Sequence, residues 1–202
     1  MRTTKTIAAL LLGLAAGAAQ AQPVEQYVGL QLINSSSSCE GFSQGVAPLG
    51  LSATCKDDDE GYRVSYGMWF SQLFGFEVGY QDAGEGHADA FAADGSHALT
   101  LTAPLKAWDV LFLARARLPQ GVDLVGRLGA ARWDYEVRSS TGGFGASNTK
   151  TTLTYGLSLD WRWLTVGYDV IHDVGQSNLL DPTAPDIKQD VKRWSVGGKW
   201  RF

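Results

Sequence analysis

The chain has 202 residues, of which 45% are hydrophobic and 19% are charged. This length suffices for one domain with its own core, and a second large domain is not expected. The net charge of −4 argues against a basic face for nucleic acid, and no apolar run reaches the roughly 18–20 residues that a transmembrane helix needs. Nucleic-acid-binding proteins and helical membrane proteins are therefore excluded.

The first residues have the features of a secretory signal peptide. Arg2 and Lys5 give a basic start, residues 7–18 form an apolar run, and residues 19–21 are a small-x-small cleavage site. The apolar run is too short for a membrane anchor. We predict a cleaved signal peptide over residues 1–21 and export from the cytoplasm of a Gram-negative bacterium.

Two cysteines, Cys39 and Cys55, lie in the polar stretch of residues 34–60. Export places them in an oxidising compartment, which favours a disulfide between them. Closing a loop this short is worth about 3 kcal/mol in the chain-entropy model. The alternative is a pair of free thiols or a metal pair, but no histidine or further cysteine lies nearby in the sequence to support a metal.

The rest of the chain is dominated by alternation of apolar residues with small or polar ones, the pattern of half-buried strands. The eight alternating segments are residues 27–32, 63–70, 75–80, 109–118, 123–130, 152–161, 164–170 and 193–202. The apolar parity carries no charge in any of them. The other parity carries twelve charges: Arg63, Glu77, Asp109, Arg115, Arg117, Asp123, Arg127, Asp160, Asp169, Arg193, Lys199 and Arg201.

This segregation is typical of a transmembrane barrel, whose strands are apolar toward lipid and polar toward the lumen. The connections alternate in length as well. Short ones at residues 71–73, 119–121 and 162–163 alternate with long ones at residues 34–60, 82–104, 139–150 and 173–190. The sequence therefore predicts an all-β fold over residues 22–202: an eight-stranded antiparallel up-and-down transmembrane barrel with short periplasmic turns and long extracellular loops.

Alternation alone does not say which face points outward, and a soluble lipocalin-type carrier has the same strand count with its apolar face inside. Three observations favour lipid on the apolar side. Tyrosines and tryptophans lie near the ends of the apolar stripes, as in the aromatic girdles of membrane barrels. The polar parity mixes glycine, serine and threonine with charges of both signs, which suits a narrow lumen. Alternation continues to the terminal aromatic residue, Phe202.

Several stretches resemble OmpA-like outer-membrane barrels. Residues 61–80 resemble their second hairpin, residues 124–129 their fifth strand and residues 168–175 the end of their seventh. The ending is similar to the terminal-strand signal read by the barrel-assembly machinery, with Trp194, Val196, Gly198, Trp200 and Phe202. The separate peptidoglycan-binding domain of that family has no counterpart here, so the resemblance does not imply tethering to the cell wall.

The resemblance also implies an ion-pair cluster in the lumen. Glu77, Arg115 and Asp160 match its positions, whereas Thr165 replaces a basic residue. The nearby cations Arg63, Arg127 and Lys199 are expected to compensate for that loss. A switchable channel is one interpretation, but we favour a satisfied polar core, because charges in a narrow lumen must be paired and side chains fill an eight-stranded barrel.

An outer-membrane enzyme that modifies lipid A is the remaining alternative. It needs a serine nucleophile and a histidine oriented by an acid, and His172 with Asp169 and Ser177 is the nearest candidate set. The deacylase pattern of a serine two residues after the histidine is absent, so no catalytic residues, metal or cofactor are predicted.

We predict a small barrel with a structural or surface-interaction role in the envelope and at most a narrow pore. Its expected partners are lipopolysaccharide, the barrel-assembly machinery during biogenesis, and an unknown ligand of the extracellular loops, which include an acidic run at residues 57–60.

Overall fold

The structure is a computed structural model that describes residues 25–36, 50–56, 58–139, 145–176 and 187–202. Almost all of these residues lie in strands. The strands are β1 Glu25–Ser36, β2 Ser52–Lys56, β3 Asp58–Trp69, β4 Phe74–Phe91, β5 His97–Arg117, β6 Val122–Ser139, β7 Gly145–Trp161, β8 Leu164–Gln176 and β9 Ile187–Arg201. Among the described residues, no helix is long and apolar enough to cross a membrane.

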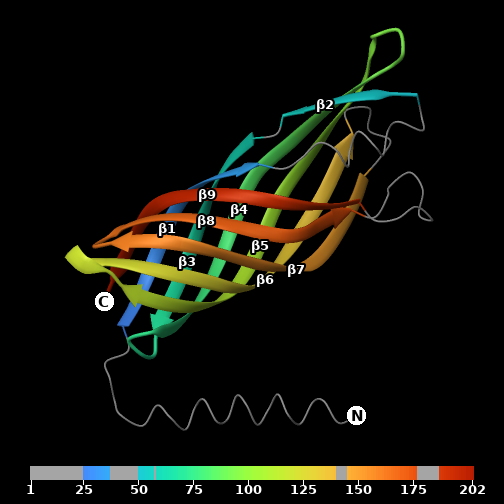
Figure 1. The fold of residues 1–202 in the computed structure, drawn as a ribbon. Coiled ribbons are helices and arrows are strands. Elements are labelled where there is room, and N and C mark those ends of the chain that lie inside the picture. The colour runs from blue at the N-terminus through green and yellow to red at the C-terminus, as the bar shows by residue number, and fades with distance from the viewer. Residues whose placement is uncertain (1–24, 37–49, 57, 140–144, 177–186) are drawn as a thin grey trace, which may run out of the picture.

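The eight long strands close on themselves, as the sequence predicts. Each pairs antiparallel with its neighbours around the ring, and the last strand, β9, pairs with the first, β1. The result is a tilted barrel whose first strand and last strand lie side by side (Figure 1). Closure leaves no unpaired sheet edge in the wall, which is what a strand protein in hydrocarbon requires.

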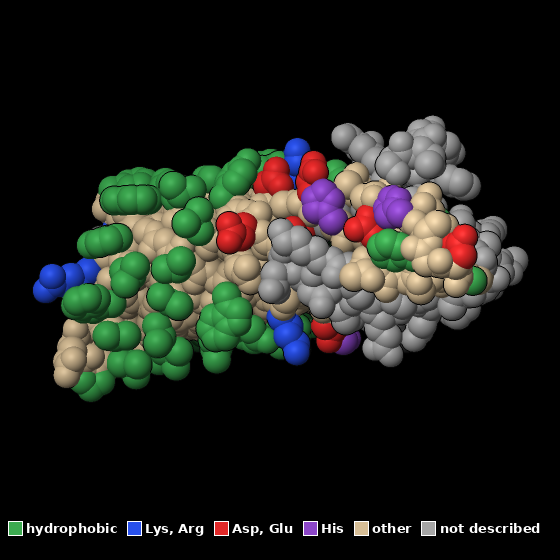
Figure 2. Space-filling view, turned by 90° about the horizontal axis from the view of Figure 1, so that it is seen from above, with side chains coloured by type: hydrophobic (Ala, Val, Ile, Leu, Met, Phe, Trp, Pro, Cys, Tyr) green, Lys and Arg blue, Asp and Glu red, His purple; other side chains and the backbone are tan. Residues whose placement is uncertain are grey.

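The face that points outward is the apolar one. On β1, Val28, Leu30 and Leu32 are exposed, whereas Tyr27 and Gln31 on the other parity are almost completely buried. The same alternation holds around the wall, and hydrophobic side chains cover the barrel surface in Figure 2. A lipocalin has the opposite arrangement, so the lipocalin-type carrier is excluded.

One end of the barrel, here called the turn end, carries the three short connections and both described termini. The Ser71 hydroxyl accepts the Leu73 and Phe74 N–H groups at 3.2 and 2.9 Å, which fixes the turn between β3 and β4. Arg162, in the two-residue turn between β7 and β8, takes φ = 54°. At the terminus, the Phe202 N–H donates to the Gln26 carbonyl at 3.0 Å.

At the opposite end, the loop end, the strands run much further than the alternating segments. The sequence predicts a loop at residues 82–104, but β4 continues to Phe91 and β5 begins at His97, so most of this segment is a long hairpin (Figure 1). The short strand β2 pairs with its β4 side. We call β2 with residues 85–91 and 97–104 the β4–β5 arm. Small or apolar residues alternate with polar ones here as well, at residues 87–90 and 99–103, but the segment is also rich in Gly and Asp, which favours a loop.

A β-bulge marks the point where the arm leaves the wall. Three steps on β4, from Asp82 to Glu85, match two steps on β5, and Gly84 within the bulge has φ = 88°. Such a bulge bends the strand and increases its twist, which redirects the arm away from the barrel axis.

Two predictions fall outside the described residues. The signal peptide at residues 1–21 and Cys39 are not described, and neither is the Cys55 side chain. The cleavage and the disulfide therefore stay predictions.

Candidate functional site

The barrel interior holds a set of paired charges. Arg63 on β3 lies 2.8 Å from Glu77, measured from Nη1 to Oε1, and its Nε donates to Asp109 Oδ2 at 3.0 Å. The Tyr27 hydroxyl donates to the other oxygen of Glu77. All four side chains are buried, so each carboxylate depends on these donors in place of water.

A second group centres on Asp169 of β8. Its Oδ2 lies 3.4 Å from Arg127 Nη1 and 2.8 Å from Arg193 Nη2. One carboxylate therefore neutralises two guanidinium groups in part, and all three side chains are nearly inaccessible to solvent.

A third group joins the ends of β7 and β9. Lys199 Nζ lies 2.7 Å from Asp160 Oδ2, and the Thr165 hydroxyl donates to Asp160 Oδ1 at 2.7 Å. The Lys199 ammonium also lies 5.0 Å from the centre of the Tyr27 ring, a cation–π contact that connects this group to Glu77. We call the three groups together the interior network.

Inward glycines make room for these side chains. A Cβ on Gly79 would overlap the Arg63 guanidinium and the Asp109 carboxylate, and a Cβ on Gly67 would overlap the Tyr27 ring. These glycines explain why the polar parity mixes small residues with long charged ones.

Arg115 lies apart from the interior network. It pairs with Glu25 at 3.2 Å and Asp123 at 3.6 Å near the turn end, and its guanidinium lies 4.2 Å from the centre of the Trp69 ring. Along β5 it is six residues from Asp109, or about 20 Å at the usual rise of a strand. The resemblance grouped Arg115 with Glu77, but the structure places it in a separate cluster at the mouth.

Apolar side chains also fill parts of the lumen. Toward the loop end, Trp133 packs with a cluster that includes Ile33, Ile171 and Val191. Its indole N–H donates to the Thr152 hydroxyl at 3.1 Å, so the ring is held in place. A second cluster nearer the turn end contains Tyr27, Trp69, Leu111, Leu113 and Val125.

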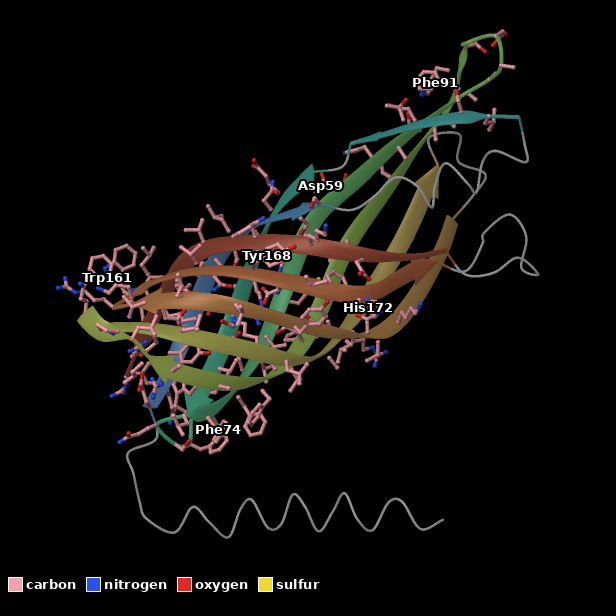
Figure 3. The ribbon with its side chains drawn as sticks, viewed as in Figure 1. Asp59, Phe74, Phe91, Trp161, Tyr168 and His172 are labelled. Carbon is pink, nitrogen blue, oxygen red and sulfur yellow. The ribbon has the colours of Figure 1, made fainter. Side chains whose placement is uncertain are left out.

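The candidate catalytic set is not assembled around Asp169. His172 points outward from β8, whereas Asp169, three residues away, points into the lumen, because side chains alternate along a strand. His172 Nδ1 instead lies 2.7 Å from Asp190 Oδ1 on the outer surface, toward the loop end in Figure 3. Ser177 lies outside the described residues.

A small polar cluster lies on the β4–β5 arm. The Thr100 hydroxyl donates to Asp89 Oδ1, and His97 Nε2 lies 3.2 Å from the same oxygen. The hydroxyl and the imidazole stabilise the charged carboxylate, which lowers the pKa of Asp89 below its usual value. Within the described residues, no group of three or more His, Cys, Asp or Glu side chains is arranged to hold a metal ion.

Comparison with known proteins identifies the family. The family described as "outer membrane protein beta-barrel domain" matches residues 6–202. The chain belongs to the outer membrane beta-barrel family. Its place is therefore the bacterial outer membrane, where short turns face the periplasm and long connections face outside. No curated protein matches it in sequence.

Solved structures of other outer membrane barrels share the fold. Ail, the attachment invasion locus protein of Yersinia pestis, is 17% identical with a TM-score of 0.53, over 90% of this chain and 100% of Ail. Neisserial surface protein A is 13% identical with a TM-score of 0.55, over 88% and 97% of the two chains. OprG from Pseudomonas aeruginosa is 14% identical with a TM-score of 0.55, over 89% and 95%.

In this outer membrane barrel the aromatic residues bound the apolar belt. Trp161 and Phe74 lie at the periplasmic turn end, as Figure 3 shows, and Trp108 and Trp194 lie toward the extracellular end of their stripes. All four side chains are exposed on the outer surface. These are the positions that interfacial girdles occupy in membrane barrels.

The terminal strand contributes its predicted assembly residues to the same outer face. Trp194, Val196, Trp200 and Phe202 are all exposed there. Gly198 is covered, because a Cβ at that position would lie 3.1 Å from the Trp200 ring.

Sequence reasoning singled out five members of the interior network, Arg63, Glu77, Arg127, Asp160 and Lys199, which lie close together as described. It did not assign Asp109, Asp169, Arg193 or Tyr27 to the lumen cluster. Asp109, Asp169 and Arg193 are charged residues on the polar parity, and a prediction based on parity alone would have included them. Tyr27 carried no such signal, because it is not a charged residue.

Proposed function

We propose that this protein is a structural and surface-interaction barrel of the outer membrane, with a lumen that does not conduct. The observation that carries the proposal is the content of the lumen. Paired charges fill its centre, and the cluster around Trp133 lies between that centre and the extracellular mouth. Apolar constrictions oppose conduction because water leaves them, so this cluster acts as a barrier to ions.

The extracellular side supplies the surface for interaction. The β4–β5 arm extends well beyond the belt and carries acidic, histidine and hydroxyl side chains, among them Asp89, His97 and Thr100. In Figure 2 acidic and histidine side chains gather toward this end of the molecule. A polar arm on a sealed barrel is suited to binding an extracellular partner and not to passing solutes.

Lipopolysaccharide is the proposed partner at the rim of the belt. Lys106, Arg132 and Lys192 are exposed on the outer face, just beyond the extracellular end of the apolar stripes of their strands. Arg132 lies directly opposite Trp108 on the neighbouring strand, so a cation stands beside a girdle residue, and Lys106 lies 3.7 Å from Asp82. Cations at this level face the phosphate groups of the outer leaflet.

Fractionation followed by conductance measurement tests the function. We expect the protein to partition with the outer membrane, to migrate differently on gels before and after heating, and to give no discrete current steps in planar bilayers. A water-filled porin is the positive control. Regular current steps that depend on protein concentration would contradict the sealed lumen, and a soluble periplasmic monomer would contradict the membrane role.

Removal of the rim cations tests the lipopolysaccharide contact. We expect the Arg132→Gln, Lys192→Gln double variant to retain several-fold less lipopolysaccharide after extraction, because phosphate loses two partners. The matched control is Arg162→Gln, at an exposed position on the periplasmic turn. Equal retention by the double variant and the control would exclude this role.

A further inference from the structure

A turn of tryptophan, arginine and tryptophan stands at the periplasmic end of the outer wall. Trp161 ends β7, Arg162 and Trp163 form the two-residue turn, and β8 begins at Leu164. Both indole rings are exposed, and the Arg162 guanidinium carbon lies 5.2 Å from the centre of the Trp161 ring. Figure 3 shows Trp161 at this tip of the barrel, on the side where the turns face the periplasm.

A third tryptophan lies beside the turn. Trp200 on the terminal strand β9 is exposed, and a Cβ on Gly198 would lie 3.1 Å from its ring and 3.6 Å from the Trp163 ring. Gly198 therefore leaves room for both rings. The Lys199 N–H donates to the Trp163 carbonyl at 2.6 Å, which holds the turn against β9. We call Trp161, Arg162, Trp163 and Trp200 the turn-end patch.

The turn favours glycine at the position that Arg162 occupies. Arg162 has φ = 54°, in the left-handed region that residues with a Cβ rarely adopt. Two-residue hairpin turns that need a positive φ at their first central position usually have glycine there. An arginine in this conformation is strained, which indicates that its side chain has a use of its own.

The polar groups of the turn-end patch have no partner within the described part of the chain. No carboxylate there lies within ion-pair distance of Arg162, and none of the three indole N–H groups has an acceptor. The nearest inward carboxylate, Asp160, is buried and pairs with Lys199. The terminal carboxylate belongs to Phe202, which hydrogen-bonds with Gln26 on the β1 side of β9, away from β8. Arg162 is therefore a cation that a ligand outside the barrel can reach.

We propose that the turn-end patch binds the headgroup of an anionic phospholipid in the periplasmic leaflet. Tryptophan rings lie at the level where acyl chains end and headgroups begin. A guanidinium forms paired hydrogen bonds with a phosphate, and indole N–H groups donate to phosphate or ester oxygens. The patch thus supplies one cation and three donors at the depth of the lipid phosphates.

The charge of the patch selects among phospholipids. Between Lys192 at the extracellular rim and the periplasmic turn, no acidic side chain lies on the outward positions of β7, β8 or β9, all of which are described. Phosphatidylglycerol has a net negative charge that Arg162 neutralises. Phosphatidylethanolamine adds an ammonium group, and the outer face has no carboxylate here to receive it. An anionic headgroup is therefore favoured over a zwitterionic one.

A lipid suits the patch better than a periplasmic protein does. Leu159 and Val166 lie opposite each other on β7 and β8, next to the turn, and both are exposed on the lipid-facing wall. The three tryptophan rings continue this surface, so lipid already surrounds them. A protein partner would have to displace that lipid before it reached the rings.

Competition between two phospholipids with the same acyl chains tests the proposal. The folded barrel is placed in bilayers of phosphatidylethanolamine and phosphatidylglycerol in equal amounts, extracted in mild detergent and examined by native mass spectrometry. We expect the wild type to retain phosphatidylglycerol several-fold over phosphatidylethanolamine. Arg162→Gln should lose this preference. Arg117→Gln should keep it, because Arg117 is an exposed cation at the same end of the barrel but on the inward parity, near Asp123.

Arg162→Gly separates the charge from the turn. Glycine suits the left-handed conformation, so this variant keeps the hairpin, and we expect it to lose the lipid preference as Arg162→Gln does. Heat-dependent gel migration establishes that each variant is folded. Equal retention of the two lipids by the wild type overturns the proposal, as does an unchanged preference in both Arg162 variants.

Three further measurements identify the ligand. Glycerol phosphate in excess should leave the bound lipid in place, and displacement would show that the patch binds phosphate without a lipid. Retention of lipid A over phosphatidylglycerol, when both are supplied, overturns the choice of leaflet. A photocrosslinker in place of Trp163 should capture phospholipid in cells, and capture of a periplasmic protein alone overturns the choice of a lipid. None of these outcomes changes the conductance test of the sealed lumen.

Discussion

At the scale of single residues, the interior is governed by the need to pair charges away from water. Asp169 meets two guanidinium groups, from Arg127 and Arg193, and none of the three reaches solvent. A buried pair of this kind contributes little net stability compared with an apolar replacement, but removing one partner leaves an uncompensated charge. The interior network is therefore more sensitive to single substitutions than its modest net contribution to the free energy of unfolding suggests.

Replacement of the shared carboxylate should show this sensitivity. We expect Asp169→Asn to lower the free energy of unfolding by about 3–5 kcal/mol, because two buried cations lose their anion. Urea titration in phospholipid vesicles, followed by gel mobility, measures the change. Lys192→Gln, at an exposed position on β9, is the matched control and should stay within about 0.5 kcal/mol of the wild type. A loss below about 1 kcal/mol for Asp169→Asn would contradict the pairing.

The stability of the β4–β5 arm depends on pH through one residue, Asp89. The pKa of Asp89 is lowered by the Thr100 hydroxyl and by His97, so the carboxylate stabilises the arm above its usual pKa of about 4 and loses this effect as pH falls through the lowered value. We expect Thr100→Val to raise the pKa of Asp89 toward its usual value. Titration of the Asp89 carboxyl carbon by NMR measures it. An unchanged midpoint in Thr100→Val would show that the hydroxyl has no such role.

At the scale of the strand, one parity faces hydrocarbon and the other faces the lumen, and each obeys a different rule. Outward positions exclude charge throughout the belt. Inward positions accept charge where a partner of opposite sign on another strand reaches it across the lumen, as Asp109 on β5 reaches Arg63 on β3. The arm lies beyond the belt and is subject to neither rule, so charged side chains such as Asp89 and His97 are exposed on it.

An arginine placed on the outer face measures the depth of a strand in the membrane. We expect Leu157→Arg, in the middle of the stripe of β7, to lower the free energy of unfolding by about 2–4 kcal/mol. Trp163→Arg, in the exposed periplasmic turn, should cost about 0–1 kcal/mol, because the cation reaches the interface. Equal costs at both positions would mean that Leu157 does not lie in hydrocarbon.

At the scale of the whole molecule, closure decides both where the protein resides and what it transmits. A ring of eight strands satisfies every strand edge in the wall and is just wide enough to be filled by side chains. Here the filling is a central set of ion pairs with apolar clusters on either side, around Trp133 and around Leu113. In a barrel filled in this way, function depends on the outer wall and the extracellular arm. We therefore expect no current steps in planar bilayers.

The sequence by itself determined the barrel, its eight strands and the side that faces lipid. The barrel and its strands follow from period-two alternation with every charge of the alternating segments on one parity. The side that faces lipid follows from the aromatic residues at the ends of the apolar stripes, the small residues on the polar parity and the alternation up to Phe202. The same pattern predicted the three short turns. It also contained the interior charges, because Asp109, Asp169 and Arg193 share the parity of the residues that were singled out.

Only the tertiary structure decided which charges meet. Partners such as Arg63 and Asp109 lie 46 residues apart, and their contact depends on strand tilt and on the register of strands across the closed ring. Strand register also places Arg115 outside the interior network and Tyr27 inside it. The arm was predicted as a loop because its short alternating stretches lie among Gly and Asp residues, and only the pairing of β4 with β2 and β5 shows that the ladder continues there.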